Sequence, residues 1–160
     1  MTFLLAFLLA ACAARRPVEG LIDAPDAPDT VGAVELITVD GDSWTLRLGD
    51  EGAPLRWAEG LRVAVTGPRF GRRLRVRDWR VLDAGDGSGG FAGVLRAHGS
   101  RVVIDDRNTG ATLLISDGDA AALRRHVGEV VVLVGHITGA NVISVHAFKV
   151  LRPPPAAPVR

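Results

Sequence analysis

The sequence predicts a mostly β protein: two small five-stranded β-barrels in tandem, with one short helix in the second. Two observations lead to this prediction. Glycine and proline, 19 and 9 of the 160 residues, are spread between short apolar stretches, as is typical of short strands joined by tight turns. The apolar pattern of the first half also returns in the second half. A chain of this length has room for one ordinary domain or two very small ones.

The repeat is clearest in the last strand of each half. Trp79 and Phe148 lie 69 residues apart, and each follows a point where the alternation of apolar residues slips by one position. One extra residue that moves the other side chains to the inner face is the signature of a β-bulge. The sequence therefore predicts an internal duplication, with bulges near Arg77-Asp78 and His146-Ala147.

Other elements follow from local patterns. First strands are expected at residues 31–34 and 91–94, and an apolar alternation around Trp44 predicts a half-buried strand. Asp119–Val127 is rich in alanine, begins with an aspartate suited to a helix cap and is followed by a glycine, so it predicts a short helix. The first half has only Gly49–Gly60 at this point, and its helix is expected to be reduced or missing.

Five strands with a helix between the third and the fourth resemble the OB-fold, a small and partly open barrel. The resemblance covers residues 91–151 well and residues 31–82 less well. It rests on strand order and spacing, so it implies an architecture and leaves the function open.

The first residues predict export. Phe3–Ala11 is an apolar run too short to span a bilayer, and it has the length and the small-residue ending of a signal peptide. The sequence Leu9-Ala10-Ala11-Cys12 resembles the lipobox of bacterial lipoproteins. That resemblance implies a lipid on the thiol of Cys12 and two or three acyl chains in all, which anchor a protein firmly. No basic residue precedes Phe3, which departs from the usual pattern; an N-terminal strand or helix with an incidental cysteine is the alternative interpretation.

The chain then divides into regions by composition. We expect a signal peptide at 1–11, the lipidated cysteine and a disordered tether at 12–30, and a first β-domain at 31–83. A glycine-rich linker at 84–90, a second β-domain at 91–152 and a proline-rich tail at 153–160 follow. The expected location is the cell envelope, at the outer membrane facing the periplasm or the cell surface.

Arginines supply the clearest charged feature. Arg73, Arg75 and Arg77 alternate with apolar residues, so they should lie on one face of a strand, roughly 6.5 Å apart. Guanidinium groups at this spacing suit phosphate or carboxylate groups. The alternative is a solvated face balanced by Asp78, Asp83 or acids on the neighbouring strand.

Single-stranded nucleic acid is not among the expected ligands. Base stacking needs free aromatic side chains, but Trp44, Trp79 and Phe148 fall in the inward set. Only Trp57 and Phe70 are expected to be free, and export would separate the protein from nucleic acid.

Neither a metal site nor a catalytic site is predicted, and no cofactor is expected. His136 and His146 end or interrupt adjacent strands and are the best metal candidates, but no recognisable ligand spacing surrounds them. Asp105 and Asp106 should point to opposite faces of a strand, and no serine lies in a nucleophile elbow.

The sequence therefore favours a non-enzymatic, lipid-anchored binding or scaffolding module. An envelope protein or an anionic glycan is its candidate partner. A metal-dependent enzyme built on the second half is the alternative from another class, and a nucleic-acid-binding module is a third.

Overall fold

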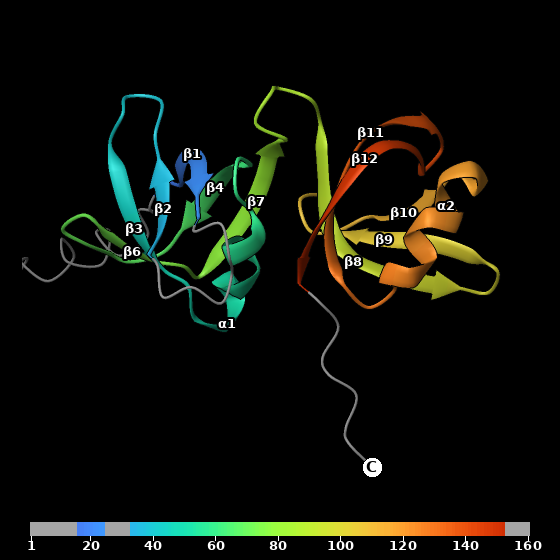
Figure 1. Cartoon of the computed structure of the whole chain (residues 1–160), viewed down its shortest axis with the longest axis horizontal. Coiled ribbons are helices and arrows are strands. Elements are labelled where there is room, and N and C mark those ends of the chain that lie inside the picture. Colours follow the sequence, from blue (N-terminus) through green and yellow to red (C-terminus); the bar gives the residue numbers. More distant parts are fainter. Residues whose placement is uncertain (1–15, 25–32, 153–160) are drawn as a thin grey trace, which may run out of the picture.

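The fold of the chain is given by a computed structural model, which describes residues 16–24 and 33–152. Strands dominate, and they form two units joined where β7 leads into β8 (Figure 1). In the first unit the elements are β1 (Val18–Asp23), β2 (Val34–Ile37), β3 (Ser43–Arg47), α1 (Gly49–Gly52), η1 (Ala53–Trp57), β4 (Arg62–Thr66), β5 (Arg69–Phe70), β6 (Arg73–Arg75) and β7 (Asp78–Asp83). In the second they are β8 (Gly90–His98), β9 (Arg101–Asp106), β10 (Thr112–Ile115), α2 (Asp117–Leu123), η2 (Arg124–His126), β11 (Val130–Gly139) and β12 (Val142–Arg152).

One of the two predicted barrels is closed. The second unit is a closed barrel in the order β10-β12-β11-β8-β9, whereas the first is an open seven-stranded sheet in the order β5-β6-β3-β2-β1-β4-β7. The first sheet stays open because its last strand is interrupted at Val76-Arg77. Its first part, β6, pairs with β3, and its second part, β7, pairs with β4. The prediction of two tandem barrels is therefore confirmed for the second unit only, since the sheet of the first unit does not close.

Both units nevertheless use the same set of pairings. Each starts with three antiparallel strands, β1-β2-β3 and β8-β9-β10. The strand after the helix returns to pair with the first strand, as β4 does with β1 and β11 with β8. The last strand runs antiparallel to that strand and parallel to the third. This shared plan supports the predicted internal repeat.

The register of the last strands matches as well. Val65 pairs with Trp79 in the first unit, and Leu133 pairs with Phe148 in the second, at the spacings expected from the sequence. In the second unit, the register between β11 and β12 shifts by one residue, so that His146 has no partner residue on β11, as predicted. At the corresponding point of the first unit the strand breaks instead of bulging.

The predicted tether is wrong for residues 18–23, which form β1 in the middle of the first sheet. Buried positions alternate with exposed ones along β1, with Val18, Gly20 and Ile22 on the buried side, so this short segment follows the strand period. The first unit consequently begins at β1, and residues 34–37 form its second strand instead of its first. The lipobox and tether residues 12–15 and 25–30 lie outside the described residues, as does the tail at 153–160.

The helical predictions fared better. The predicted helix at Asp119–Val127 is present as α2 followed by η2, although it starts two residues earlier and its N-cap position is Ser116. In the first unit the helix is reduced to α1, which has four residues, and η1. Pro54 lies at the start of η1, where its missing N–H costs nothing.

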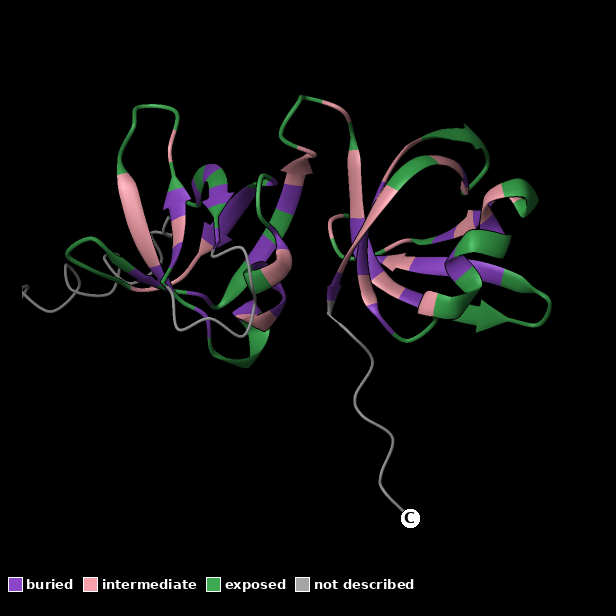
Figure 2. Cartoon of the chain, viewed as in Figure 1, coloured by how far each residue is buried: buried purple, intermediate pink, exposed green. Residues whose placement is uncertain are grey.

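The two units share part of one hydrophobic core. Successive residues of β11 belong to two different hydrophobic clusters. Val131 and Leu133 point into the closed barrel, whereas Val132 packs against the first unit. Ala92 and Leu151 join that second cluster. A strand buried on both faces explains the unbroken apolar run in β11, and the buried segments of both units are visible along the strands in Figure 2.

The predicted linker at 84–90 is a hydrogen-bonded turn. The backbone amide of Ala84 donates to the carbonyl of Ser88 (3.1 Å), and the amide of Gly85 donates to the carboxylate of Asp83 (2.8 Å). Asp86 accepts a bond from the backbone of Ser88 (2.8 Å), and hydrogen bonds from Ser88 lower the pKa of Asp86. The connection is therefore short and specified by its own polar groups.

Candidate functional site

The three predicted arginines are all exposed, and the predicted alternation is present. Arg73 and Arg75 lie in β6 and point away from the buried side chain of Leu74. Arg77 follows between β6 and β7, where its amide donates to the carbonyl of Thr66 (2.9 Å). Three cations therefore lie along one outer edge of the first unit.

Parallel pairing of β3 with β6 adds a fourth arginine. Arg47 pairs with Arg75, and it is exposed because its neighbour Leu46 fills the core. On the other side of β6, Phe70 pairs with Arg73 and is 68% exposed. Arg47, Phe70, Arg73 and Arg75 line a shallow depression of about 300 Å³. We call Arg47, Arg73, Arg75, Arg77 and Phe70 together the arginine face.

The acids that were expected to balance these arginines are engaged elsewhere. Asp78 pairs with Arg107 at 2.8 Å, and Asp83 pairs with Arg62 at 3.6 Å. Among the described residues, no carboxylate oxygen lies within 4.0 Å of a side-chain nitrogen of Arg47, Arg73, Arg75 or Arg77. Within residues 16–24 and 33–152, the arginine face thus presents cations without carboxylate partners.

The neighbouring arginines of the β5–β6 hairpin are different. Arg72 is paired with Asp42 at 2.6 Å. The guanidinium of Arg69 lies over the ring of Trp44, 5.4 Å from its centroid, and donates to the carbonyl of Arg16. These contacts fix the hairpin against β3 and against the residues that lead into β1.

The aromatic predictions hold in part. Trp79 is buried, and Phe148 packs against the core of the closed barrel. Trp44 is only partly buried; it packs against the core of the first unit, and Arg69 lies over its ring. Trp57 was expected to be free but packs on the core from η1. Phe70 is exposed as predicted.

The two metal candidates meet on the β11–β12 hairpin. Nδ1 of His136 lies 2.9 Å from Nε2 of His146, and the rings stack with centroids 4.9 Å apart. Near them, hydrogen bonds from Ser116 and from the backbone of Val145 lower the pKa of Asp119. Within residues 16–24 and 33–152, no group of three or more His, Cys, Asp or Glu is placed to hold a metal ion. The histidines form a pair on the surface and provide no third ligand.

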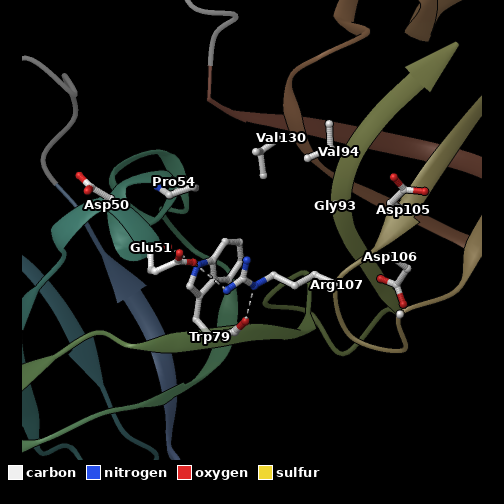
Figure 3. Close-up of a pocket in the computed structure, with 11 residues that line it drawn as sticks. Asp50, Glu51, Pro54, Trp79, Gly93, Val94, Asp105, Asp106, Arg107 and Val130 are labelled. Carbon is white, nitrogen blue, oxygen red and sulfur yellow. Dashed lines mark hydrogen bonds and ion pairs between the residues drawn. The ribbon is translucent and has the colours of Figure 1, made fainter.

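A second hollow, of about 550 Å³, lies between the units, and Figure 3 shows side chains from both sides of it. Arg107 extends from the second unit over the ring of Trp79, 5.0 Å from its centroid. Its Nε donates to the carbonyl of Trp79 (3.0 Å) and its terminal nitrogen lies 3.6 Å from Glu51. This arginine is a bridge between the units, and its Nε and one of its two terminal nitrogens are already engaged.

The acids of this hollow also have structural partners. Asp105 and Asp106 point to opposite faces, as predicted. Asp106 is buried and accepts bonds from the amide and the hydroxyl of Thr109 (3.0 and 2.6 Å). Hydrogen bonds from Thr112 and Arg96 lower the pKa of Asp105. The arrangement shapes the turn after β9 and leaves the arginine face as the best candidate site.

Comparison with known proteins does not assign the chain to a family. No protein-family model matches the chain, and no curated protein matches it. A solved structure found to be weakly similar is that of the tetrameric p202 HIN2, with 11% sequence identity. The match covers 85% of this chain and 90% of that chain, at a TM-score of 0.26. Among the described residues, none of the helices has the length and apolar character needed to cross a membrane.

Proposed function

We propose that this chain is a non-catalytic binding module of the bacterial cell envelope, anchored by lipid on Cys12, whose arginine face binds anionic ligands. The observation that supports this best is a set of exposed arginines that have no carboxylate partner in the part of the chain that the structure describes, arranged around an exposed phenylalanine. If these arginines formed only a solvated face, we would expect them to form ion pairs with the nearest acids. Asp78 and Asp83 pair with other arginines instead.

The chemistry of the face suits phosphate, sulfate or carboxylate groups. A guanidinium can grip each of these with two parallel hydrogen bonds, and adjacent strands hold Arg47 and Arg75 roughly 5 Å apart. Like charges this close repel each other, at a cost of a few tenths of a kcal/mol per exposed pair. An anion placed between them would relieve that repulsion.

Binding is tested on a heparin column at low salt. We expect the chain from Ala13 to Arg160 to be retained and then released by moderate salt, because the attraction between exposed charges is screened. Replacing Arg73, Arg75 and Arg77 with glutamine should abolish retention. The charge-matched control replaces Arg101, Arg124 and Arg125, three exposed arginines of the second unit. Both variants change the formal net charge from +1 to −2 (1 − 3), so only the position of the charge differs.

Three results are informative. Loss of retention in the first variant alone supports the arginine face. Equal loss in both variants would show that overall charge, not this face, causes retention. Passage of the wild-type chain straight through the column at low salt would end the proposal of anion binding.

Lipidation is tested separately in bacterial cells. We expect the wild-type chain to incorporate a fatty-acid analogue and to be recovered with the membrane fraction. Cys12→Ser should abolish labelling and leave an unprocessed precursor, since the thiol is the acceptor. Ala14→Ser, two residues away, is the matched control and should be labelled normally. Continued labelling of Cys12→Ser would refute the lipid anchor.

A further inference from the structure

The start of β1 lies beside the arginine face. Arg69, on the strand that pairs with β6, donates to the carbonyl of Arg16, two residues before β1 begins. The segment that precedes β1 is thus fixed to the same hairpin that carries Phe70 and Arg73. In Figure 1, β3 and β6 lie on the side of the first unit that faces away from the second unit. The second unit therefore does not cover this side.

The distance to the proposed anchor is short. Only six residue steps separate Cys12 from Val18, the first residue of β1. A fully extended chain covers about 3.3–3.6 Å per residue, so the start of β1 stays within roughly 20 Å of the lipidated cysteine. The presence of β1 removes most of the tether that the sequence suggested, so a lipid anchor on Cys12 would hold the arginine face close to the membrane.

The composition of the face matches a membrane surface better than a soluble ion. Exposed arginines bind lipid phosphates, and an exposed aromatic ring can enter the boundary between headgroups and acyl chains. Phe70, at 68% exposure, has no role in either hydrophobic core. Binding of a free phosphate would account for the arginines but would not account for the exposed phenylalanine.

We propose that the arginine face is a membrane-docking surface, which rests on the anchored binding module proposed above. Phe70 inserts at the interface of an anionic phospholipid bilayer, while Arg47, Arg73 and Arg75 bind the phosphates around it. The lipid anchor supplies the attachment, and the arginine face sets the orientation, with the second unit and the β11–β12 hairpin turned toward the aqueous side.

The test uses the chain from Ala13 to Arg160 without lipid. Every residue of both cores lies between Val18 and Leu151, so this chain retains the complete fold. Flotation with vesicles of phosphatidylcholine and phosphatidylglycerol should recover the protein, and vesicles of phosphatidylcholine alone should not. Each arginine near an anionic surface contributes about fivefold in affinity, so replacing Arg73, Arg75 and Arg77 with glutamine should weaken binding roughly 100-fold.

Phe70 separates docking from simple charge attraction. Phe70→Ala should weaken vesicle binding while heparin retention is unchanged. In Phe70→Trp, anionic vesicles should shift the emission of the new tryptophan to shorter wavelength, whereas inorganic phosphate should not. The charge-matched variant of Arg101, Arg124 and Arg125 should bind vesicles like the wild type.

Two results would overturn the docking proposal and leave anion binding intact. One is retention on heparin with no recovery on anionic vesicles, which would mean that the anions are soluble or glycan-borne. The other is unchanged vesicle affinity in Phe70→Ala. Failure on both heparin and vesicles would refute the proposed function as well.

Discussion

Replacing Trp79 with alanine is expected to lower the free energy of unfolding by about 4 kcal/mol, the cost of removing a large aromatic side chain from a core. Trp79 is 2% exposed and belongs to the cluster that both units share. Its indole nitrogen donates to the carbonyl of Glu51 (2.8 Å), so the substitution also leaves a carbonyl of α1 without its partner. The measurement is denaturant unfolding followed by circular dichroism.

We expect the loss of stability in Trp79→Ala to affect the second unit as well, because Arg107 of that unit contacts Trp79. The guanidinium of Arg107 stacks on the indole of Trp79 and is held by Asp78 (2.8 Å). A double-mutant cycle with Trp79→Ala and Arg107→Ala should show coupling of about 0.5–2 kcal/mol, because a cation over an aromatic ring is attracted to it and the two side chains share one site. Additive losses would show that the stacking contributes nothing to stability.

Two variants serve as controls. Trp79→Phe keeps most of the buried surface and loses the bond to Glu51, so it should cost less than the alanine variant. Phe70→Ala removes an exposed ring and should change stability by no more than about 0.5 kcal/mol. A loss below about 1 kcal/mol in Trp79→Ala would contradict the placement of this side chain in the shared core.

Pattern in the sequence was sufficient for the repeat and for the second unit. The slip before Trp79 and before Phe148 marks a real feature, because inward residues must change phase where the last strand passes from one partner strand to the other. The unbroken run in β11 predicted a strand but could not show that one face of it covers the first unit. Which unit each face of β11 contacts depends on how the two units pack together, and the periodicity of apolar residues within one strand carries no information on that packing.

The sequence analysis did not predict the first strand, because the composition of the residues around it is typical of a disordered segment. Residues 18–23 are flanked by arginine, proline and aspartate, and glycine occupies one of the inward positions, so only Val18 and Ile22 mark the buried side. Composition therefore favoured a tether. The stronger clue was topological, since a unit that starts at residue 34 lacks the first strand with which the strand after the helix pairs, and β4 would pair with β7 alone.

The arginine face was half predictable. Arg73, Arg75 and Arg77 follow from alternation alone. Arg47 joins them only through the parallel pairing of β3 with β6, a contact between segments far apart in the chain. Its own alternation with Leu46 was visible, and the strand order of the resembled fold would have placed it beside Arg75. The structural roles of Asp78 and Asp83 depend on Arg107 and Arg62, which no short-range pattern indicates.

Gly93→Ala is expected to lower the free energy of unfolding by about 3 kcal/mol, because overpacking against fixed backbone is poorly tolerated. A methyl group at Gly93 in β8 would lie 1.9 Å from the carbonyl oxygen of Asp105 in β9. The neighbouring strand would have to move, and in a closed barrel that movement disturbs the ladders on both sides. Gly20 occupies the same place in the first unit, where a methyl group would lie 2.4 Å from the carbonyl oxygen of Ile37.

Gly118→Ala is the matched control, since it adds the same methyl group in the first turn of α2, where nothing lies within 4 Å. Alanine is the better helix former, so this variant should be neutral or more stable by up to about 1 kcal/mol. Gly20→Ala should behave like Gly93→Ala if the two units are copies of one plan, with a smaller loss because an open sheet yields more easily than a closed barrel. Equal stability of Gly93→Ala and Gly118→Ala, measured by denaturant unfolding, would contradict the close approach of β8 and β9. A large loss in Gly93→Ala with none in Gly20→Ala would instead mean that the repeat is limited to strand order.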